Sequence, residues 1–341
     1  MTVEKTTVQQ GVSSESAAAE PVLEVNHLVK HFPVTSSFLG RTIGQVRAVE
    51  DVSFTINKGE TLGLVGESGS GKSTVGKVVL RLLDATDGQV KLHGQDITTV
   101  SGQALRDTRK QMQMVFQDPY ASLNPKLSAG ETIMEPLENY QDISQAQRNE
   151  RASELIDRVG LRQDALQRYP HEFSGGQRQR LGVARALALN PSLIVADEPV
   201  SALDVSVQAQ VLNLLIRLQE ELDLTYLFVS HDLAVVEHIS HRVAVMYLGH
   251  IVELADKKSL FTSPQHPYTE ALLSAVPIPD PTADNKHKRV ILSGDIPSPI
   301  NPPSGCCFHT RCPVAEPRCS QEVPVLKSVS LSHQVACHLR S

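Results

Sequence analysis

The fold is decided by the stretch Thr61-Leu-Gly-Leu-Val65 and the residues directly after it, Gly66-Glu-Ser-Gly-Ser-Gly-Lys-Ser-Thr74. The first five residues predict a buried strand, and an apolar helix is expected from Val75 to Leu83. This order of strand, loop and helix matches the phosphate-loop pattern G-x-x-x-x-G-K-[ST] in the context that the pattern requires. Its glycines let successive N–H groups face one anion at the positive end of a helix. The sequence therefore predicts a nucleotide phosphate site.

Three residues of the loop have specific expected roles. Lys72 is expected to reach the β and γ phosphates, Ser73 to ligate Mg²⁺ and Thr74 to contact a phosphate. The alternative, a Gly/Ser surface turn, explains the flanking strand and helix poorly. The expected nucleotide-binding residues of the loop are Gly66, Glu67, Ser68, Gly69, Ser70, Gly71, Lys72, Ser73 and Thr74.

Further strand-like runs alternate with longer stretches of helical period. These runs are Met112 to Phe116, Leu193 to Ala196, Thr225 to Val229 and Val243 to Tyr247. Alternation of this kind is typical of an α/β domain.

Polar residues follow three of these runs. Asp197 is expected to hold Mg²⁺, directly or through water, and Glu198 to polarise the attacking water. Adjacent acids after a strand are often only a solvated turn, but a phosphate loop upstream favours the functional interpretation. His231 and Gln117 also follow strands, at the edge where ligands collect in open α/β sheets.

Composition excludes several classes of protein. The 341 residues carry 32 basic and 38 acidic side chains, a net charge of −6, so no overall basic footprint indicates nucleic acid. The longest apolar stretch, around residues 181–196, contains Arg185, Asn190 and Pro191, so no membrane span is expected. Residues 1–20 are polar and lack the features of a secretory signal, which predicts a disordered cytoplasmic tail.

The run Phe173-Ser-Gly-Gly-Gln-Arg-Gln-Arg180 resembles the signature motif of ATP-binding-cassette (ABC) ATPases. With it, Gln117 matches the Q-loop position, Ser201-Ala-Leu-Asp204 the D-loop and His231 the switch histidine. The resemblance covers residues 21–275. It implies an α/β phosphate-loop ABC-type core with an antiparallel β subdomain and a helical signature subdomain at about residues 118–185.

The resemblance also implies site residues outside the loop. In this family two cassettes pack head to tail, and each ATP lies between one phosphate loop and the other cassette's signature segment. The implied roles are Glu198, His231 and Gln117 in catalysis, with Gln117 also at the metal beside Ser73 and Asp197. The signature-side residues would be Ser174, Gly175, Gly176, Gln177 and Asp204. An aromatic ring upstream should stack on adenine; Phe32 matches that position, and Phe38 competes with it.

Three further stretches are similar to the oligopeptide/dipeptide importer subfamily, namely residues 117–125, 267–269 and 298–302. This likeness, closest to the dipeptide-type subunit, implies an ATPase at the cytoplasmic face of the inner membrane. Its implied partners are a second, related ATPase in a heterodimer, two permeases and a periplasmic or lipid-anchored substrate-binding protein, without nucleic acid. The segment from Gln117 to about Glu135 is expected to line the groove of this chain that accepts a short cytoplasmic helix of a permease. The alternatives are a soluble ATPase, a redox-responsive interaction subunit, and an importer of glutathione-like or metal-chelate cargo.

Residues 276–341 form a proline-rich module that contains all five cysteines of the chain. The resemblance implies a [4Fe-4S] cluster on Cys306, Cys312, Cys319 and Cys337. Cys307 is an extra thiol that could replace Cys306, and zinc or unused thiols are the alternatives. The cluster would lie at the far end of the chain from the phosphate loop, and nothing in the sequence suggests that it touches ATP. We therefore expect it to have a structural or docking role.

Overall fold

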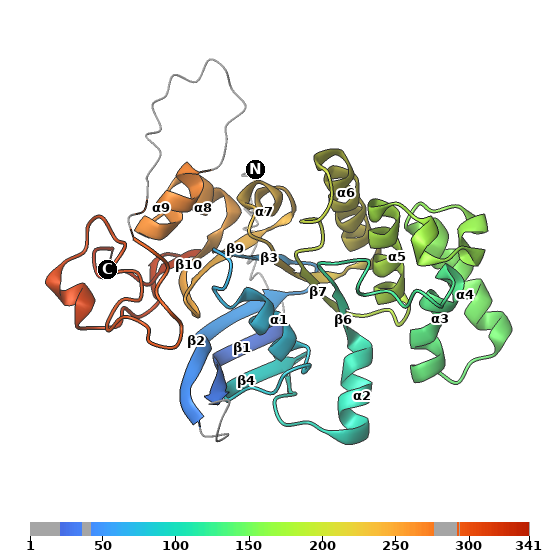
Figure 1. Ribbon diagram of the computed structural model, residues 1–341, viewed down its shortest axis with the longest axis horizontal. Coiled ribbons are helices and arrows are strands. Elements are labelled where there is room, and N and C mark those ends of the chain that lie inside the picture. The colour runs from blue at the N-terminus through green and yellow to red at the C-terminus, as the bar shows by residue number, and fades with distance from the viewer. Residues whose placement is uncertain (1–20, 36–41, 276–291, 293, 341) are drawn as a thin grey trace, which may run out of the picture.

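The computed structural model describes residues 21–35, 42–275, 292 and 294–340 (Figure 1). The expected tail at residues 1–20, the candidate Phe38 and most of the linker after residue 275 lie outside these ranges.

An eight-stranded sheet runs through the molecule in the order β11-β12-β10-β9-β3-β8-β7-β6. Strands β9, β3, β8, β7 and β6 are parallel to one another, whereas β10, β12 and β11 add antiparallel pairs beyond β9. Their bounds are β3 Thr61–Val65, β6 Met112–Val115, β7 Leu193–Asp197, β8 Thr225–Val229, β9 Arg242–Tyr247, β10 His250–Asp256, β11 Lys327–Ser330 and β12 His333–Val335. All five predicted strands are present, with ends within one residue of the prediction.

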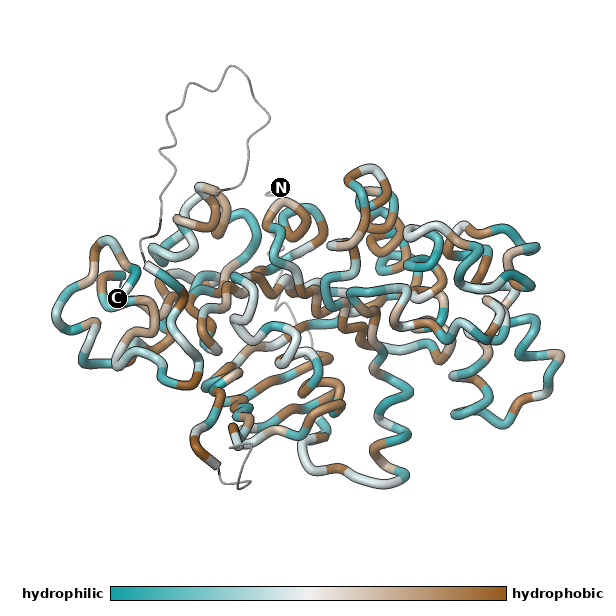
Figure 2. The backbone as a smooth tube through the Cα atoms, viewed as in Figure 1, coloured by the Kyte–Doolittle hydropathy of each residue, from teal (hydrophilic) through white to brown (hydrophobic). Residues whose placement is uncertain are grey.

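These strands are apolar throughout because both faces of the sheet are covered. In β8, Leu227 and Val229 pack into one core, while Tyr226 and Phe228 pack into the other. Parallel strands buried on two sides need no polar alternation. The resulting continuous apolar band is visible along the sheet in Figure 2.

One core lies between the central sheet and a four-stranded antiparallel sheet. That sheet has the order β2-β1-β4-β5, with bounds β1 Pro21–Thr35, β2 Thr42–Asn57, β4 Asp87–Leu92 and β5 Gln95–Asp96. Helix α1, Lys72–Val79, lies between the two sheets and contributes Val75 and Val78 to this core (Figure 1). The helix thus starts three residues earlier than predicted, directly at the phosphate loop.

The other face is covered by α6, Val205–Leu222, α7, Leu233–Ile239, and a group of helices on one side of the molecule (Figure 1). That group comprises α3 Ala129–Tyr140, α4 Gln145–Arg158 and α5 Gly175–Leu187, while α2 Gly102–Gln111 precedes β6. Capping boxes at Ser128 and Ser144 start α3 and α4 by satisfying backbone N–H groups.

The described part of the C-terminal module, residues 294–340, is here called the extension. It follows α8, Lys257–Thr262, and α9, Pro267–Ser274, and it contains only a short 3₁₀ turn, Pro317–Ser320, and two strands. Its strand β12 pairs with β10, and the buried carboxylate of Glu253 accepts hydrogen bonds from His333 Nε2 at 2.6 Å and from the His266 N–H at 2.9 Å. The extension therefore shares its sheet with the core.

Within the described residues, no helix combines the length and hydropathy that crossing a bilayer requires.

Candidate nucleotide-binding site

A cavity of about 630 Å³ opens where the parallel strands end at their carboxyl edge. The phosphate loop follows β3, and Gln117, Glu198 and His231 follow β6, β7 and β8. Since these strands are parallel, residues far apart in sequence meet at one edge. The lining residues are Val46, Ala48, Glu67, Ser68, Gly69, Gly71, Lys72, Ser73, Thr74, Gln117, Glu198, His231 and Pro299.

The loop backbone leaves no room for side chains at two glycines. Gly66 has φ 151° and Gly71 has φ 103°, and a Cβ atom would collide with the carbonyl oxygens of Met246 and Ala48 respectively. The curled loop holds Lys72, whose Nζ donates to the Gly66 and Glu67 carbonyls at 2.7 and 2.9 Å. Burial lowers the pKa of Lys72, while the charges of Glu198, Asp197 and Glu67 raise it. A polyanion entering the cavity would meet this buried ammonium.

The expected metal ligands Ser73 and Asp197 are in contact. Ser73 Oγ donates to Asp197 Oδ1 at 2.8 Å, and burial raises the pKa of the Asp197 carboxyl against this hydrogen bond. A hydroxyl and a carboxylate oxygen fit Mg²⁺, which keeps several waters and takes its remaining ligands from phosphates. The donor set therefore suits that ion.

Glu198 is the meeting point of the three expected catalytic residues. Its carboxylate accepts a hydrogen bond from Gln117 Nε2 at 2.9 Å and lies 3.2 Å from His231 Nδ1. Its backbone has φ 47°, in the left-handed region that non-glycine residues rarely adopt, and its N–H donates to the Val229 carbonyl at 2.9 Å. Strained backbone conformations of this kind are common at functional sites, where they fix the direction of a side chain.

The signature residues lie elsewhere. Ser174 is the N-cap of α5, where Oγ accepts from the Gln177 N–H while Gln177 Oε1 accepts from the Ser174 N–H. The Ser174 hydroxyl can therefore still donate. Neither Ser174, Gly175, Gly176, Gln177 nor Asp204 lines the cavity beside the chain's own phosphate loop.

Gly176 and Asp204 also have local structural roles that the sequence did not reveal. A Cβ atom on Gly176 would overlap the Val207 side chain of α6. Asp204 is the N-cap of α6 and accepts from the Val207 N–H at 3.1 Å and from Ser206 Oγ at 2.8 Å. Close helix packing accounts for Gly176 without any ligand.

Phe32 does not line the cavity, although its strand partner Val46 does. Its half-buried ring lies under Lys30, with Nζ 5.0 Å from the ring centroid. The adenine role of Phe32 stays a prediction.

The extension reaches the nucleotide site, a contact that the sequence did not predict. Arg311 donates to both carboxylate oxygens of Glu67, and Pro299 is part of the cavity wall. Sequence reasoning missed both residues, because 244 positions separate Arg311 from Glu67 and no local pattern connects them.

The arrangement of the cysteines gives less support to the expected iron–sulfur cluster than the sequence did. Burial, with smaller contributions from the charges of Cys319, Cys337 and Cys312, raises the pKa of Cys306 to about 11, so these thiols share one neighbourhood. Cys307 instead points to the Tyr247 carbonyl at 3.8 Å. However, the described part of the chain contains no group of three or more His, Cys, Asp or Glu side chains that could hold a metal ion. The iron–sulfur cluster is therefore not supported.

A second groove, of about 440 Å³, lies between the end of α1 and helices α3 and α5. It is lined by residues that include Leu82, Phe116, Ser122, Glu135 and Arg185. Ser122 and Glu135 come from the segment expected to face a permease. Leu82 is 50% exposed, so an apolar side chain is open to solvent there.

Two family models match the chain. A model described as ABC transporter matches residues 49–201, and one described as oligopeptide/dipeptide transporter, C-terminal region, matches residues 252–319.

Curated relatives match nearly the whole chain. The oligopeptide transport ATP-binding protein AppF of Bacillus subtilis (strain 168) is 56% identical over 327 residues, 96% of this chain and 99% of AppF. The probable peptide ABC transporter ATP-binding protein y4tS of Sinorhizobium fredii (strain NBRC 101917 / NGR234) is 56% identical over 323 residues, 95% of this chain and 91% of that protein.

Solved structures share the core. The ATP-binding cassette MJ0796, a dimer in a post-hydrolysis state bound to ADP and Pi, is 29% identical with a TM-score of 0.61, over 69% of this chain and 98% of that one. The protein cbiO1 of Clostridium perfringens has the same fold, at 24% identity and a TM-score of 0.62, over 72% of this chain and 92% of that one.

Fold and site together define an ATP-binding cassette. Within that class, the chain belongs to the ABC transporter family as an ATPase subunit that carries the oligopeptide/dipeptide C-terminal region.

Proposed function

We propose that this chain hydrolyses ATP to drive import of peptides across the cytoplasmic membrane, as one nucleotide-binding subunit of an importer. The observation that carries the hydrolytic part is the convergence of Gln117 and His231 on the Glu198 carboxylate, beside Lys72 and Ser73. The peptide cargo is supported by the names of relatives that match 95% or more of the chain. Soluble or non-peptide alternatives have no comparable support.

Each residue of the site has a proposed part in hydrolysis. Lys72 and the loop N–H groups from Gly69 to Thr74 bind the β and γ phosphates, and Ser73 and Asp197 hold Mg²⁺ with help from Gln117. The bound ion would neutralise phosphate charge. Glu198 orients the attacking water and accepts its proton, and His231 contacts the γ phosphate and holds the Glu198 carboxylate in place.

A second cassette is proposed to complete the site. The signature segment lies away from the chain's own phosphate loop, yet the Ser174 hydroxyl and the Gly175 and Gly176 N–H groups at the start of α5 can bind a phosphate. A facing cassette could use them for its own ATP, and MJ0796 is dimeric. We infer that the partner in the working complex is a related but different ATPase.

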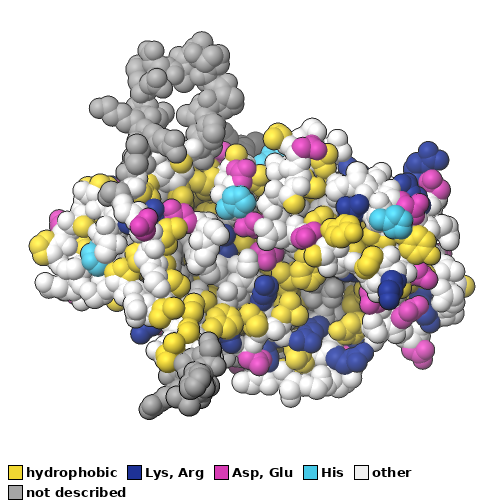
Figure 3. All heavy atoms as spheres, in the orientation of Figure 1, with side chains coloured by type: hydrophobic (Ala, Val, Ile, Leu, Met, Phe, Trp, Pro, Cys, Tyr) yellow, Lys and Arg dark blue, Asp and Glu magenta, His cyan; other side chains and the backbone are white. Residues whose placement is uncertain are grey.

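The permeases are proposed to dock in the groove between α1, α3 and α5. Movement of the helical subdomain relative to Gln117 would then link the phosphate state to transport. Two permeases and a periplasmic or lipid-anchored binding protein would complete the importer, with this chain at the cytoplasmic face. Acidic and basic side chains are mixed over the face in Figure 3, which gives no support to a nucleic-acid partner.

The proposed cofactors are ATP and Mg²⁺, without the iron–sulfur cluster. Metal and sulfide analysis of anaerobically purified protein tests this choice. About four iron atoms per chain would show that the chain does hold the cluster and would contradict this choice.

Reconstitution tests the function. The chain is assembled with its permeases and second ATPase in proteoliposomes, and uptake of labelled di- and oligopeptides is measured with and without ATP. Peptide uptake that needs ATP, and that stops when Glu198→Gln replaces the wild-type chain, supports the proposal. ATP hydrolysis without peptide uptake, in the presence of the binding protein, contradicts it.

A further inference from the structure

The extension is joined to the phosphate loop by an ion pair. Arg311 Nη1 and Nη2 donate to Glu67 Oε2 and Oε1 at 2.8 and 3.2 Å. The Arg311 side chain is 8% exposed and that of Glu67 is 25% exposed, so solvent screens this pair less than a surface pair. Two parallel hydrogen bonds between a guanidinium and a carboxylate fix the orientation of both groups.

Both partners are held in place by aromatic side chains. The rings of Tyr247, Tyr268 and Phe308 pack together with centroids 4.7 to 5.4 Å apart. Arg311 Nη1 lies 3.4 Å from Tyr247 Oη, and the Glu67 N–H donates to Tyr268 Oη at 2.9 Å. Glu67 is thus fixed through its backbone by α9 and through its carboxylate by the extension.

Glu67 is also part of the nucleotide cavity. It lines that cavity beside Lys72 and Ser73, and its carbonyl accepts the 2.9 Å hydrogen bond from Lys72 Nζ. An unpaired carboxylate at this position would repel the phosphates of a bound nucleotide, because Coulomb energies are large where water is partly excluded. Arg311 supplies the opposite charge.

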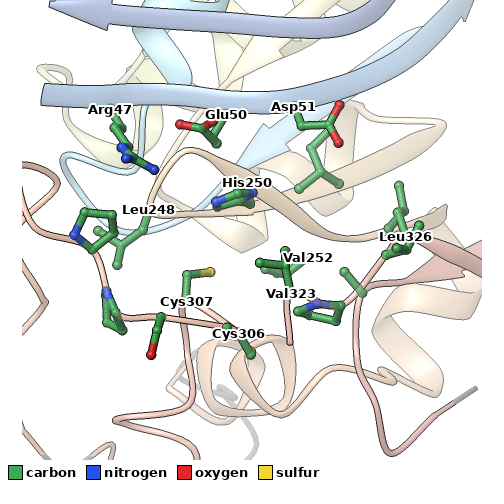
Figure 4. Close-up of a pocket in the computed structure, with 18 of the residues that line it drawn as sticks. Arg47, Glu50, Asp51, Leu248, His250, Val252, Cys306, Cys307, Val323 and Leu326 are labelled. Carbon is green, nitrogen blue, oxygen red and sulfur yellow. The ribbon is translucent and has the colours of Figure 1, made fainter. Parts of the chain in front are cut away.

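A second contact brings the extension to another part of the cavity wall. The Arg47 N–H donates to the Pro299 carbonyl at 3.1 Å, and Pro299 lines the cavity next to Val46 and Ala48. Behind this contact, a separate cavity of about 910 Å³ lies between β2 and the extension. Figure 4 shows Arg47, Glu50 and Asp51 on one side of it and Cys306, Val323 and Leu326 on the other. The extension therefore reaches β2 without packing against it along its whole length.

We propose that the extension is a working part of the nucleotide site, and that Arg311 is a positioning residue that neutralises Glu67 and so sets the affinity for nucleotide phosphates. This inference rests on the proposed nucleotide site. Arg311 acts only through Glu67, and the strength of nucleotide binding depends on how firmly the extension is seated. Whatever displaces residues 299–312 would weaken ATP binding without touching the ATP.

Nucleotide affinity of the full chain tests the proposal. Binding of Mg·ATP and Mg·ADP is measured by calorimetry for the wild type, Arg311→Met and the double variant Arg311→Met/Glu67→Gln. Arg311→Met should raise the Kd for Mg·ATP about tenfold, which is about 1.4 kcal/mol. It should raise the Kd for Mg·ADP only about threefold, because Mg·ADP carries half the net charge and is repelled half as strongly. The double variant should recover most of the lost affinity, since no free carboxylate remains.

The matched control is Arg318→Met. Arg318 lies in the same module, where it forms an exposed pair with Glu322 at 2.8 Å, and its replacement should leave both Kd values unchanged. Thermal melting of each variant shows that it is folded.

Three results overturn the proposal. They are wild-type affinity in Arg311→Met, equal losses for ATP and ADP, and a folded double variant that recovers nothing. If the wild type itself binds no Mg·ATP, the proposed nucleotide site fails instead, so the two failures are distinguishable.

Discussion

Ser73 Oγ donates to Asp197 Oδ1 over 2.8 Å, and this hydrogen bond joins the phosphate loop to the end of β7 across 124 positions of sequence. Both oxygens are in the place where a hard cation would be held between the loop and the sheet.

The Asp197→Asn substitution should separate stability from metal binding. Burial raises the pKa of Asp197, so its ionised form destabilises the metal-free fold at neutral pH. The variant should therefore melt about 2 °C higher without metal, for a gain of about 1 kcal/mol. It should also lose most of the stabilisation that Mg·ATP gives the wild type. Differential scanning fluorimetry with and without Mg·ATP and EDTA measures both, and a lower melting temperature in EDTA contradicts the argument.

The Glu198→Gln substitution should stop hydrolysis but not binding. The amide keeps the size of the side chain near Gln117 and His231 but cannot accept the proton of the attacking water, so turnover should fall at least about 100-fold. ATP should stay bound and hold the two cassettes together, as gel filtration with ATP would show. Glu220→Gln, at an exposed position of α6, is the control. Near wild-type turnover by Glu198→Gln in the assembled complex would show that another group orients the water.

The Lys72→Ala substitution should remove binding itself. It deletes the buried ammonium at the phosphate position and leaves the Gly66 and Glu67 carbonyls without their donor. We expect the Kd for Mg·ATP to rise about 100-fold. Lys58→Ala, which breaks an exposed pair with Asp223, should have no effect. An unchanged Kd in Lys72→Ala would place the phosphates elsewhere.

The Leu82→Glu substitution should uncouple the ATPase from its membrane partners. A charge on this exposed wall of the groove between α1, α3 and α5 would have to be desolvated on docking. ATP binding should stay normal, while copurification with the permeases should be lost. Leu331→Glu, at a fully exposed leucine between β11 and β12, is the matched control. Full assembly with Leu82→Glu would exclude this groove as the docking site.

The stability contributed by Asp256 should depend on pH. Its carboxylate accepts from Ser259 Oγ and Ser332 Oγ, both at 2.6 Å, and these hydrogen bonds lower its pKa to about 2. A lowered acid pKa stabilises the fold at pH values above the ordinary pKa, and the effect is lost as the pH falls toward 2. Asp256→Asn should therefore cost about 1 kcal/mol of unfolding free energy at pH 7, allowing for solvent exposure.

Urea unfolding at a series of pH values measures this difference. The gap between the wild type and Asp256→Asn should narrow below pH 4. A gap that stays constant from pH 7 to pH 3 would mean that charge is not its cause.

The parts of the site that could be predicted from the sequence are those whose residues lie in short contiguous segments. The loop from Gly66 to Thr74 and the acids at the end of β7 carry their chemistry in neighbouring residues, and parallel strands dictate where they meet. The contact between Arg311 and Glu67 depends on how a segment rich in proline folds back over the sheet, and no periodicity encodes that path. The packing of Gly176 against Val207 could not be predicted from the sequence either, because Val207 lies on another helix.

The pairing of β12 with β10 has a consequence for how the chain is made. Glu253 precedes His333 by 80 residues, so during synthesis β10 exists as an open edge strand before its neighbour has been translated. An open edge invites pairing with other nascent chains, and a charged residue facing inward on the edge discourages it. Until His333 arrives, the Glu253 carboxylate is that charge. The residue that later anchors the extension would first protect the unfinished sheet from aggregation.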